Sequence, residues 1–332
     1  EYNMIGLTDY ITECCWEDTF TIWYVLIDDA YQHLITCLGR RLRQRGPEPT
    51  FSDSEVITVA MIIETFFGGD EELGLAFVSQ YHLDLFPQLL DNGQFNRRRR
   101  HLTGVMELIR RQYNQLLIDP DDRVRLIDSA PIPACTYTRN GHCETVLGPE
   151  YMSVMVSKKA KLFGHRFHAT TTLNQVIDRW MLAPAAPNDG KLTPAFFEDQ
   201  TDLWVLGDNA FHVPDEIAWL QSERNIILTA ALRKDAKEPL PAKVRRLFNR
   251  LRRRIETVFS VMTTVFNLET PGSRSLSGLL ARLTTSVLAY NLSFFTTIEF
   301  CTLQTRNYSF HYNLKHKSFC RKSQNLCTTL SA

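Results

Sequence analysis

Residues 124–132 read VRLIDSAPI, a short apolar run of strand type that carries an acid, Asp128. A second apolar run, LWVLGDNAF at residues 203–211, ends in Gly-Asp and carries Asp208. A carboxylate at the end of a buried strand needs a partner, because burying an unpaired charge costs several kcal/mol. The two runs therefore predict two buried strands, each ending in an acid that binds a cation, pairs with an arginine or caps the N-terminus of a helix.

The segments after Asp128 alternate between strand and helix patterns. Residues 164–173 alternate in polarity and are rich in Thr, and residues 176–185 follow them across the turn Asn174–Gln175, which predicts a hairpin. The strand of Asp208 comes next. Four further elements complete the order: a helix at 216–224, a buried strand at 225–232, and two helices at about 242–266 and 276–295. This order predicts an α/β domain with a mixed sheet.

A third acid, Glu256, lies in the predicted helix of residues 242–266. Apolar residues recur along this helix with the spacing of a core stripe: Val244, Leu247, Phe248, Leu251, Ile255, Phe259, Met262 and Phe266. Glu256 follows Ile255 and is rotated by about 100°, so we expect it on the flank of the stripe. Three carboxylates brought together would repel one another, and two divalent cations would relieve that repulsion.

Composition and charge limit the class of protein. The 332 residues hold 44% apolar and 22% charged residues, which excludes a mainly disordered chain and predicts about two domains. Residues 1–93 contain 16 acids and 4 bases, whereas residues 94–332 contain 33 bases and 21 acids, so a polyanion is expected to bind the second part. Eight irregularly spaced cysteines and charges within the most apolar stretch predict a cytoplasmic protein without a membrane span.

Three motifs, LIDSAPIP at 126–133, LGDNAF at 206–211 and RRRIETVFS at 252–260, occur in this order. Together with SKKAKLFGHRFH at 157–168, they resemble the acidic motifs of bacterial insertion-sequence DDE transposases, with the insertion sequence 982 group as the most similar. The resemblance covers about residues 50–296. The related insertion-sequence-4 signature places Tyr, Arg and Lys around the glutamate; here Arg252 matches, while Asn249 and Thr263 replace the other two.

The resemblance implies an RNase H-like catalytic domain in which Asp128, Asp208 and Glu256 bind two Mg²⁺ or Mn²⁺ ions. It implies cleavage of double-stranded DNA at terminal inverted repeats and strand transfer into target DNA. It also implies a homo-oligomer on DNA, associated with the bacterial nucleoid when bound. Two alternatives stay open: a catalytically inactive, transposase-derived DNA-binding protein, and an RNase H-like nuclease without strand transfer.

Two basic segments are candidate DNA-binding surfaces. Seven of the twelve residues from Lys243 to Arg254 are basic, on the same helix as Glu256. A polyanion would gain charge-assisted hydrogen bonds there, unless the segment is simply a solvated face. The arginines of residues 97–100 lie in a predicted helix or helix pair; they either contact DNA ends or pair with the acidic N-terminal part. The candidate DNA contacts are Arg97, Arg98, Arg99, Arg100, Lys158, Lys159, Arg245, Arg246, Arg250, Arg252 and Arg253.

Two domains and a C-terminal tail are predicted. Residues 1–118 form a helical region with possible DNA-end binding, and residues 119–300 form the RNase H-like catalytic domain. Residues 301–332 hold five bases, no acids and little periodicity, so we expect a poorly ordered tail. The segment CTYTRNGHC at 135–143 lacks the paired-cysteine spacing of a zinc site, and no zinc is expected.

Overall fold

The computed structural model describes residues 16–40, 42, 46–135, 137–138, 143, 146–155, 160–231 and 241–306, with Trp16, Met155 and residues 297–306 as backbone only. It divides into two compact units. The helices before Asn114, together with the last helix from Thr284 onward, form the N-terminal unit, and Asn114–Leu283 forms the second unit. The functional limits predicted at residues 118 and 300 stay predictions.

The N-terminal unit consists of helices, so the predicted helical region is confirmed. Its elements are α2 (Trp16–Leu38), α3 (Asp53–Phe67), α4 (Glu71–Tyr81), α5 (Asn92–His101), α6 (Thr103–Leu117) and part of α10 (Leu276–Arg306). The start of α3 follows from its sequence: Ser52 and Glu55 form a reciprocal capping box, and Gly68 ends the helix in the left-handed conformation. The basic segment before Asn114 is a helix pair, α5 and α6.

A buried ion-pair cluster joins four helices of this unit. The Arg99 side chain, on α5, is 1% exposed; it pairs with Glu64 of α3 and lies 2.9 Å from Glu71 Oε1 of α4. Ser286 of α10 donates a hydrogen bond to Glu64 Oε2 at 3.1 Å, and Arg99 Nε donates to Thr285 Oγ1 at 3.3 Å. Because each charge is paired and hydrogen-bonded, the cluster tolerates its burial.

The second unit is built on a six-stranded mixed sheet. Its strands are β1 (Val124–Pro133), β2 (Met152–Met155), β3 (Ala160–Thr171), β4 (Ile177–Pro184), β5 (Trp204–Gly207) and β6 (Ile227–Ala230). The order along the sheet is β2-β3-β1-β5-β6, and β4 pairs with β3. β1, β3 and β4 pair antiparallel, whereas β5 is parallel to β1 and β6 is parallel to β5.

An antiparallel group joined through β1 to two parallel strands is the RNase H-like arrangement, and the predicted fold class is confirmed. The hairpin predicted around Asn174–Gln175 is the β3–β4 connection, where Gln175 has a φ of 69°. The short helices are η2 (Pro149–Tyr151), η3 (Asp189–Leu192), α7 (Thr193–Phe196) and η4 (Asn209–Phe211); the longer ones are α8 (Pro214–Arg224) and α9 (Ala242–Thr264).

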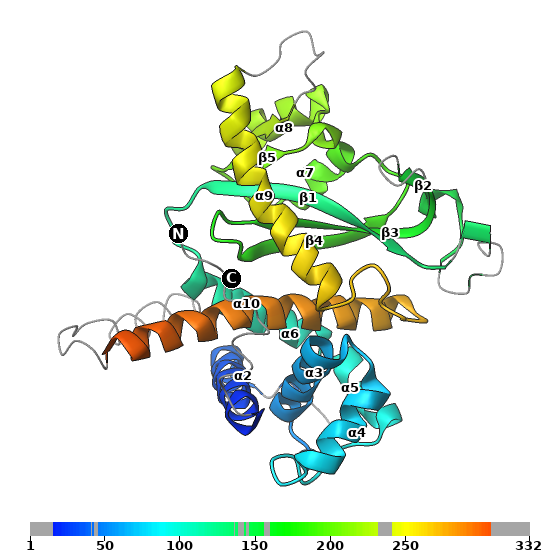
Figure 1. The fold of residues 1–332 in the computed structure, drawn as a ribbon, viewed down its shortest axis with the longest axis vertical. Helices are drawn as coiled ribbons and strands as arrows, with labels where there is room; N and C mark the ends of the chain where they lie inside the picture. Colours follow the sequence, from blue (N-terminus) through cyan, green and yellow to red (C-terminus); the bar gives the residue numbers. More distant parts are fainter. Residues whose placement is uncertain are drawn as a thin grey trace. The chain divides into compact units, whose positions relative to one another are not determined.

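Helices cover both faces of this sheet. On one face Leu126 and Leu206 pack against Ile255 of α9, which crosses the sheet over β1 (Figure 1). On the other face Ile127 and Val205 pack with residues of α7, η4 and α8. Since successive side chains of a strand point to opposite faces, the continuous apolar runs of β1 and β5 follow from this two-sided burial.

The helix α10 continues to Arg306, six residues into the segment predicted as a tail. The rest of that segment, residues 307–332, lies outside the described residues. Within the described part of the chain, no helix has the length and hydrophobicity needed to cross a membrane.

We expect Arg99→Ala to lower the free energy of unfolding by roughly 3–5 kcal/mol, because it leaves Glu64 buried without its partner. Equilibrium urea unfolding measures this change. Arg97→Ala on the exposed face of the same helix is the matched control, with an expected change within about 0.5 kcal/mol. Equal stability of the two variants would contradict a structural role for Arg99.

Candidate functional site

The register of β1 and β5 brings the two predicted aspartates together. Leu126 is paired with Leu206 on these neighbouring parallel strands, and each aspartate lies two residues further along its own chain segment. Asp208 keeps an extended backbone, with φ −80° and ψ −177°. Residues two apart on a strand share a face, and neighbouring strands lie about 4.8 Å apart. Asp128 and Asp208 therefore lie at the same end and on the same face of the sheet.

The third predicted acid lies on the helix that covers this face. Phe248 and Ile255 of α9 pack against Leu126 and Leu206, the residues that precede the two aspartates by two positions. Glu256 directly follows Ile255, and its side chain is 55% exposed, as expected for a residue on the flank of the apolar stripe. Two strand ends and one helix thus present all three acids on the α9 side of the sheet.

Arg252 lies between two of these acids. Its Nη2 atom is 3.5 Å from Asp128 Oδ2 and 3.8 Å from Glu256 Oε1, one helical turn away on α9. The two carboxylate oxygens are consequently no farther apart than the sum of these distances. The guanidinium group supplies a positive charge where the acids would otherwise face each other directly.

The environment of Asp128 disfavours its charged form. Burial is the largest cause that raises the pKa of Asp128, to about 6, and the negative charges of Asp208 and Asp189 raise it further. The Ser129 N–H group, which donates to Asp128 Oδ1 at 2.8 Å, and the charge of Arg252 act in the opposite direction. A cation placed beside Asp128 would thus offset both the cost of burying the charged carboxylate and its repulsion by the neighbouring acids.

Asp208 is fixed by the chain that follows it. Its Oδ1 atom accepts a hydrogen bond from the Ala210 N–H at 2.8 Å and so caps η4. Gly207 precedes it at a point where a Cβ atom would lie 2.9 Å from Ile127 Cγ2, so the close approach of β5 to β1 requires glycine here. In the Gly-Asp pair seen in the sequence, Gly207 thus allows close packing of the two strands and Asp208 caps the short helix that follows.

The donor set fits a divalent cation in its chemistry, since carboxylate oxygens are the ligands that Mg²⁺ prefers. Burial, and to a lesser degree the charge of Asp208, raises the pKa of Asp128, and such a cation would stabilise the charged carboxylate against both. Across the described residues, however, no group of three or more His, Cys, Asp or Glu side chains is placed to hold a metal ion. Arg252 occupies the position between Asp128 and Glu256, and its displacement is needed before both can share a cation.

The basic segment of α9 is largely open to solvent. Arg246, Arg250 and Arg253 are exposed, while Arg245 and Arg252 are partly buried. The apolar stripe expected on this helix is shorter than predicted: Val244 and Leu247 are exposed, and burial begins at Phe248. The first two turns of α9 therefore do not pack against the sheet, and their arginines are available to a polyanion.

The four arginines of α5 are not equivalent, and two of the predicted DNA contacts need correction. Arg99 is buried in the ion-pair cluster described above, and Arg98 pairs with Asp53 and with the Phe51 carbonyl oxygen. Both arginines satisfy acids of the N-terminal segment, which was the alternative interpretation. Arg97 is exposed and Arg100 partly exposed, so these two remain candidate contacts. Lys158 and Lys159 lie outside the described residues.

A buried polar cluster behind β1 was missed in the sequence. Asp189 of η3 accepts a hydrogen bond from the Ser129 hydroxyl at 2.8 Å and lies 3.4 Å from Arg166 Nη1. His168 Nε2 lies 3.9 Å from Asp189, and burial lowers the pKa of His168 to about 4. In the sequence Asp189 stands in the stretch NDGK, where no neighbouring residue points to its partner Ser129, 60 positions away.

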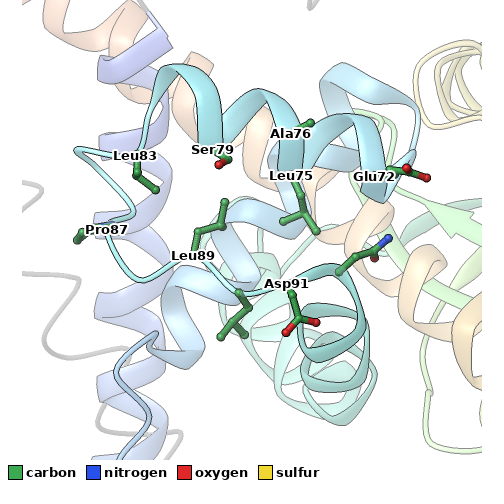
Figure 2. A pocket seen from close by; sticks show the side chains of 10 residues that line it. Glu72, Leu75, Ala76, Ser79, Leu83, Pro87, Leu89 and Asp91 are labelled. Atoms are coloured by element: carbon green, nitrogen blue, oxygen red, sulfur yellow. The ribbon is translucent and has the colours of Figure 1, made fainter.

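A surface pocket of the N-terminal unit contains none of the three acids. It has a volume of about 380 Å³ and lies between α4 and the segment that leads into α5 (Figure 2). Its lining is mostly apolar, with Leu75, Leu83 and Leu89, and Glu72 and Asp91 also line it. The pocket offers no arrangement of polar groups that resembles a catalytic site.

Comparisons with known proteins identify the second unit. A family model described as Transposase DDE domain matches residues 119–292, more than half of the chain, and this range contains all three acids. No curated protein matches the sequence.

Two solved structures show remote similarity. The cryo-EM structure of the piggyBac transposase synaptic complex with hairpin DNA is 11% identical, with a TM-score of 0.40 over 94% of this chain and 79% of that chain. The Mos1 transposase paired-end complex with left transposon end is also 11% identical, with a TM-score of 0.19 over 68% of this chain and 81% of that chain. Family membership rests on the match over residues 119–292.

We expect Asp128→Asn to stabilise the protein in EDTA above pH 6. The pKa of Asp128 is raised from 3.8 to about 6, so folding at neutral pH is opposed by roughly 2–3 kcal/mol, and this penalty disappears as pH falls below about 4. Thermal and urea unfolding at pH 4 and pH 7.5 measure the difference from wild type.

Asp178→Asn is the control for this experiment and should have the opposite sign. The Asp178 carboxylate lies 2.6 Å from Arg125 Nε in a satisfied ion pair, so its loss destabilises the protein. If Asp128→Asn is no more stable than wild type at pH 7.5, the charged form of Asp128 does not oppose folding and its pKa is not raised.

Proposed function

The chain belongs to the transposase DDE domain family, and we propose that it is a DNA transposase that cuts DNA at the ends of an insertion sequence and joins them to target DNA. The observation that carries this proposal is the equivalent placement of Asp128 and Asp208 beyond the Leu126–Leu206 pair, under the helix that carries Glu256. An arrangement that raises the pKa of a buried acid without serving packing is typical of functional sites.

In this proposal Asp128 and Asp208 would together hold divalent cations, and Glu256 would complete the second site. When bound, Mg²⁺ or Mn²⁺ ions would activate the attacking oxygen and neutralise the charge on the leaving oxygen. The reaction is hydrolysis of a phosphodiester to a free 3′-hydroxyl, followed by attack of that hydroxyl on a phosphodiester of target DNA, which releases another 3′-hydroxyl.

The exposed arginines of α9 bind the DNA backbone in this proposal. Arg253 lies within one turn of Glu256 on α9, and Arg250 and Arg246 lie about 9 and 15 Å from it along the helix axis, so phosphates bound along this helix would lead toward the acids. Arg252 has a second role: once cations replace it between Asp128 and Glu256, its guanidinium group is free to bind a phosphate. Arg97 and Arg100 are proposed to bind DNA ends, and the protein is proposed to act as a homo-oligomer on paired terminal inverted repeats.

We expect Asp208→Asn to lower DNA cleavage at least about 100-fold, because it removes a ligand worth several kcal/mol in the transition state. The assay uses a duplex carrying the terminal inverted repeats that the proposed function expects on either side of the gene, with Mg²⁺ or Mn²⁺, and separates cleaved from strand-transfer products. DNA affinity should change little. Asp215→Asn, an exposed acid in the first turn of α8, is the matched control with unchanged cleavage.

The products of this assay separate the alternatives. Cleavage and joining that both require Asp208 support the transposase. Cleavage that never leads to joined products identifies a nuclease on the same fold. Metal-independent DNA binding without any cleavage identifies an inactive derivative, and cleavage undiminished in Asp208→Asn would exclude the assigned acids.

We expect Arg246→Gln and Arg250→Gln each to weaken binding of a 20-base-pair duplex. If each arginine contacts one phosphate, the slope of log Kd against log salt falls by about one per residue. Fluorescence anisotropy between about 50 and 200 mM salt measures the slope. Arg123→Gln, an exposed arginine outside α9, should leave it unchanged. If Arg246→Gln and Arg250→Gln give the same slope as Arg123→Gln, α9 is not the DNA-binding helix.

A further inference from the structure

We propose that Asp189 and Ser129 are positioning residues that fix the two catalytic aspartates from the opposite face of the sheet. This inference rests on the proposed function. The turn of residues 188–192, which contains η3, contacts both chain segments that carry these acids: Ser129, directly after Asp128, and the η4 segment, directly after Asp208. One rigid turn thereby sets the separation of two carboxylates that come from different strands.

The contact with β1 is a buried, charge-assisted hydrogen bond. Asp189 is 7% exposed, and its Oδ2 atom accepts from the Ser129 hydroxyl at 2.8 Å. Arg166 Nη1 lies 3.4 Å from the same oxygen and 3.3 Å from Ser129 Oγ, so it completes a three-membered network. Charge-assisted bonds are stronger than neutral ones, and their burial restricts movement of the groups involved.

Asp189 acts behind the acids and is not one of them. Ser129 is paired with His168 across β1 and β3, and its side chain points away from the α9 face to which Asp128 belongs. Because Ser129 N–H donates to Asp128 Oδ1 at 2.8 Å, holding the Ser129 side chain also holds the peptide that orients the Asp128 carboxylate. Asp189 therefore acts on Asp128 indirectly, through its hydrogen bond to the Ser129 side chain and through the Ser129 N–H group.

The contact with the Asp208 segment is made by the next residue of the turn. A Cβ atom on Gly190 would lie 2.6 Å from Val213 Cγ2 and 3.1 Å from the Ala210 carbonyl oxygen. Ala210 is the residue whose N–H group donates to Asp208 Oδ1. Glycine at position 190 thus lets η3 lie directly against η4, which Asp208 caps.

Removing such supporting contacts typically costs 10–100-fold in metal affinity or activity, because carboxylate ligands must be held within about 0.5 Å of their productive positions. Ser129→Ala and Asp189→Ala are therefore expected to lower the cleavage rate constant 10–100-fold. The Kd for the duplex should stay within about twofold of wild type, since neither side chain lies on the basic surface of α9.

The experiment measures three quantities for each variant: the cleavage rate constant, the Kd for duplex DNA, and the Kd for Mn²⁺ alone, measured by titration calorimetry on the DNA-free full chain. The variants are Ser129→Ala, Ser129→Thr, Asp189→Ala and the Ser129→Ala, Asp189→Ala pair. Ser129→Thr keeps the hydroxyl and should restore the rate and the Mn²⁺ affinity. The double variant should be no slower than the slower single variant, because both remove one hydrogen bond.

Asp199→Ala is the matched control, because it removes an aspartate–arginine pair, with Arg179, that does not involve β1. It should leave all three quantities near wild type. If Asp189→Ala does not fold, Ser129→Ala and Ser129→Thr decide alone. The inference is overturned if Ser129→Ala cleaves DNA and binds Mn²⁺ as wild type does, if its rate and DNA affinity fall in parallel, or if the double variant is additive.

Failure of this inference differs from failure of the proposed function. If wild type cleaves DNA and Asp208→Asn does not, an unchanged Ser129→Ala overturns the positioning role alone. If wild type neither cleaves DNA nor binds Mn²⁺, the proposed function itself is wrong, and the positioning role falls with it.

Discussion

Two carboxylates at the ends of neighbouring parallel strands are the constraint to which the second unit is fitted. Asp128 and Asp208 follow the paired Leu126 and Leu206, so the backbone register alone brings their negative charges onto one face. Burial and mutual repulsion make this arrangement unfavourable, as the raised pKa of Asp128 shows. The surrounding groups compensate these negative charges. Arg252 of α9 lies 3.5 Å from Asp128, and backbone N–H groups donate hydrogen bonds to both acids.

The N-terminal unit treats charge in the opposite way. There Arg99 pairs with both Glu64 and Glu71, and two hydroxyl groups of α10 add hydrogen bonds to the same cluster, so buried charges hold four helices together. A run of four arginines thus serves two purposes, with the inward members satisfying acids and the outward members, Arg97 among them, facing solvent. Helical periodicity separates the two sets, because Arg97 and Arg100, three positions apart, share one face of α5, whereas Arg98 and Arg99 lie between them on the inward side.

Much of this could be predicted from the sequence because it depends on local pattern. The apolar runs around Asp128 and Asp208, the hairpin turn at Asn174–Gln175 and the capped start of α3 each carry their signal within a few residues. The remainder depends on long-range packing. The apolar spacing of α9 includes Leu247, yet that residue is 54% exposed. The spacing predicts which face of the helix is apolar, but it does not predict at which residue the helix leaves the sheet. The role of Asp189 depends on Ser129, 60 positions away.

The helix α9 has three roles along its length. Its stripe from Phe248 onward covers the sheet, its flank carries Glu256, and its exposed arginines extend past the region of packing. Arg252 lies where these regions meet and neutralises the acids at distances of 3.5 and 3.8 Å, longer than a strong ion pair. A compact divalent cation would neutralise the same oxygens with twice the charge. In the proposed function, Arg252 neutralises the acids of the metal-free chain, and a bound cation would displace it.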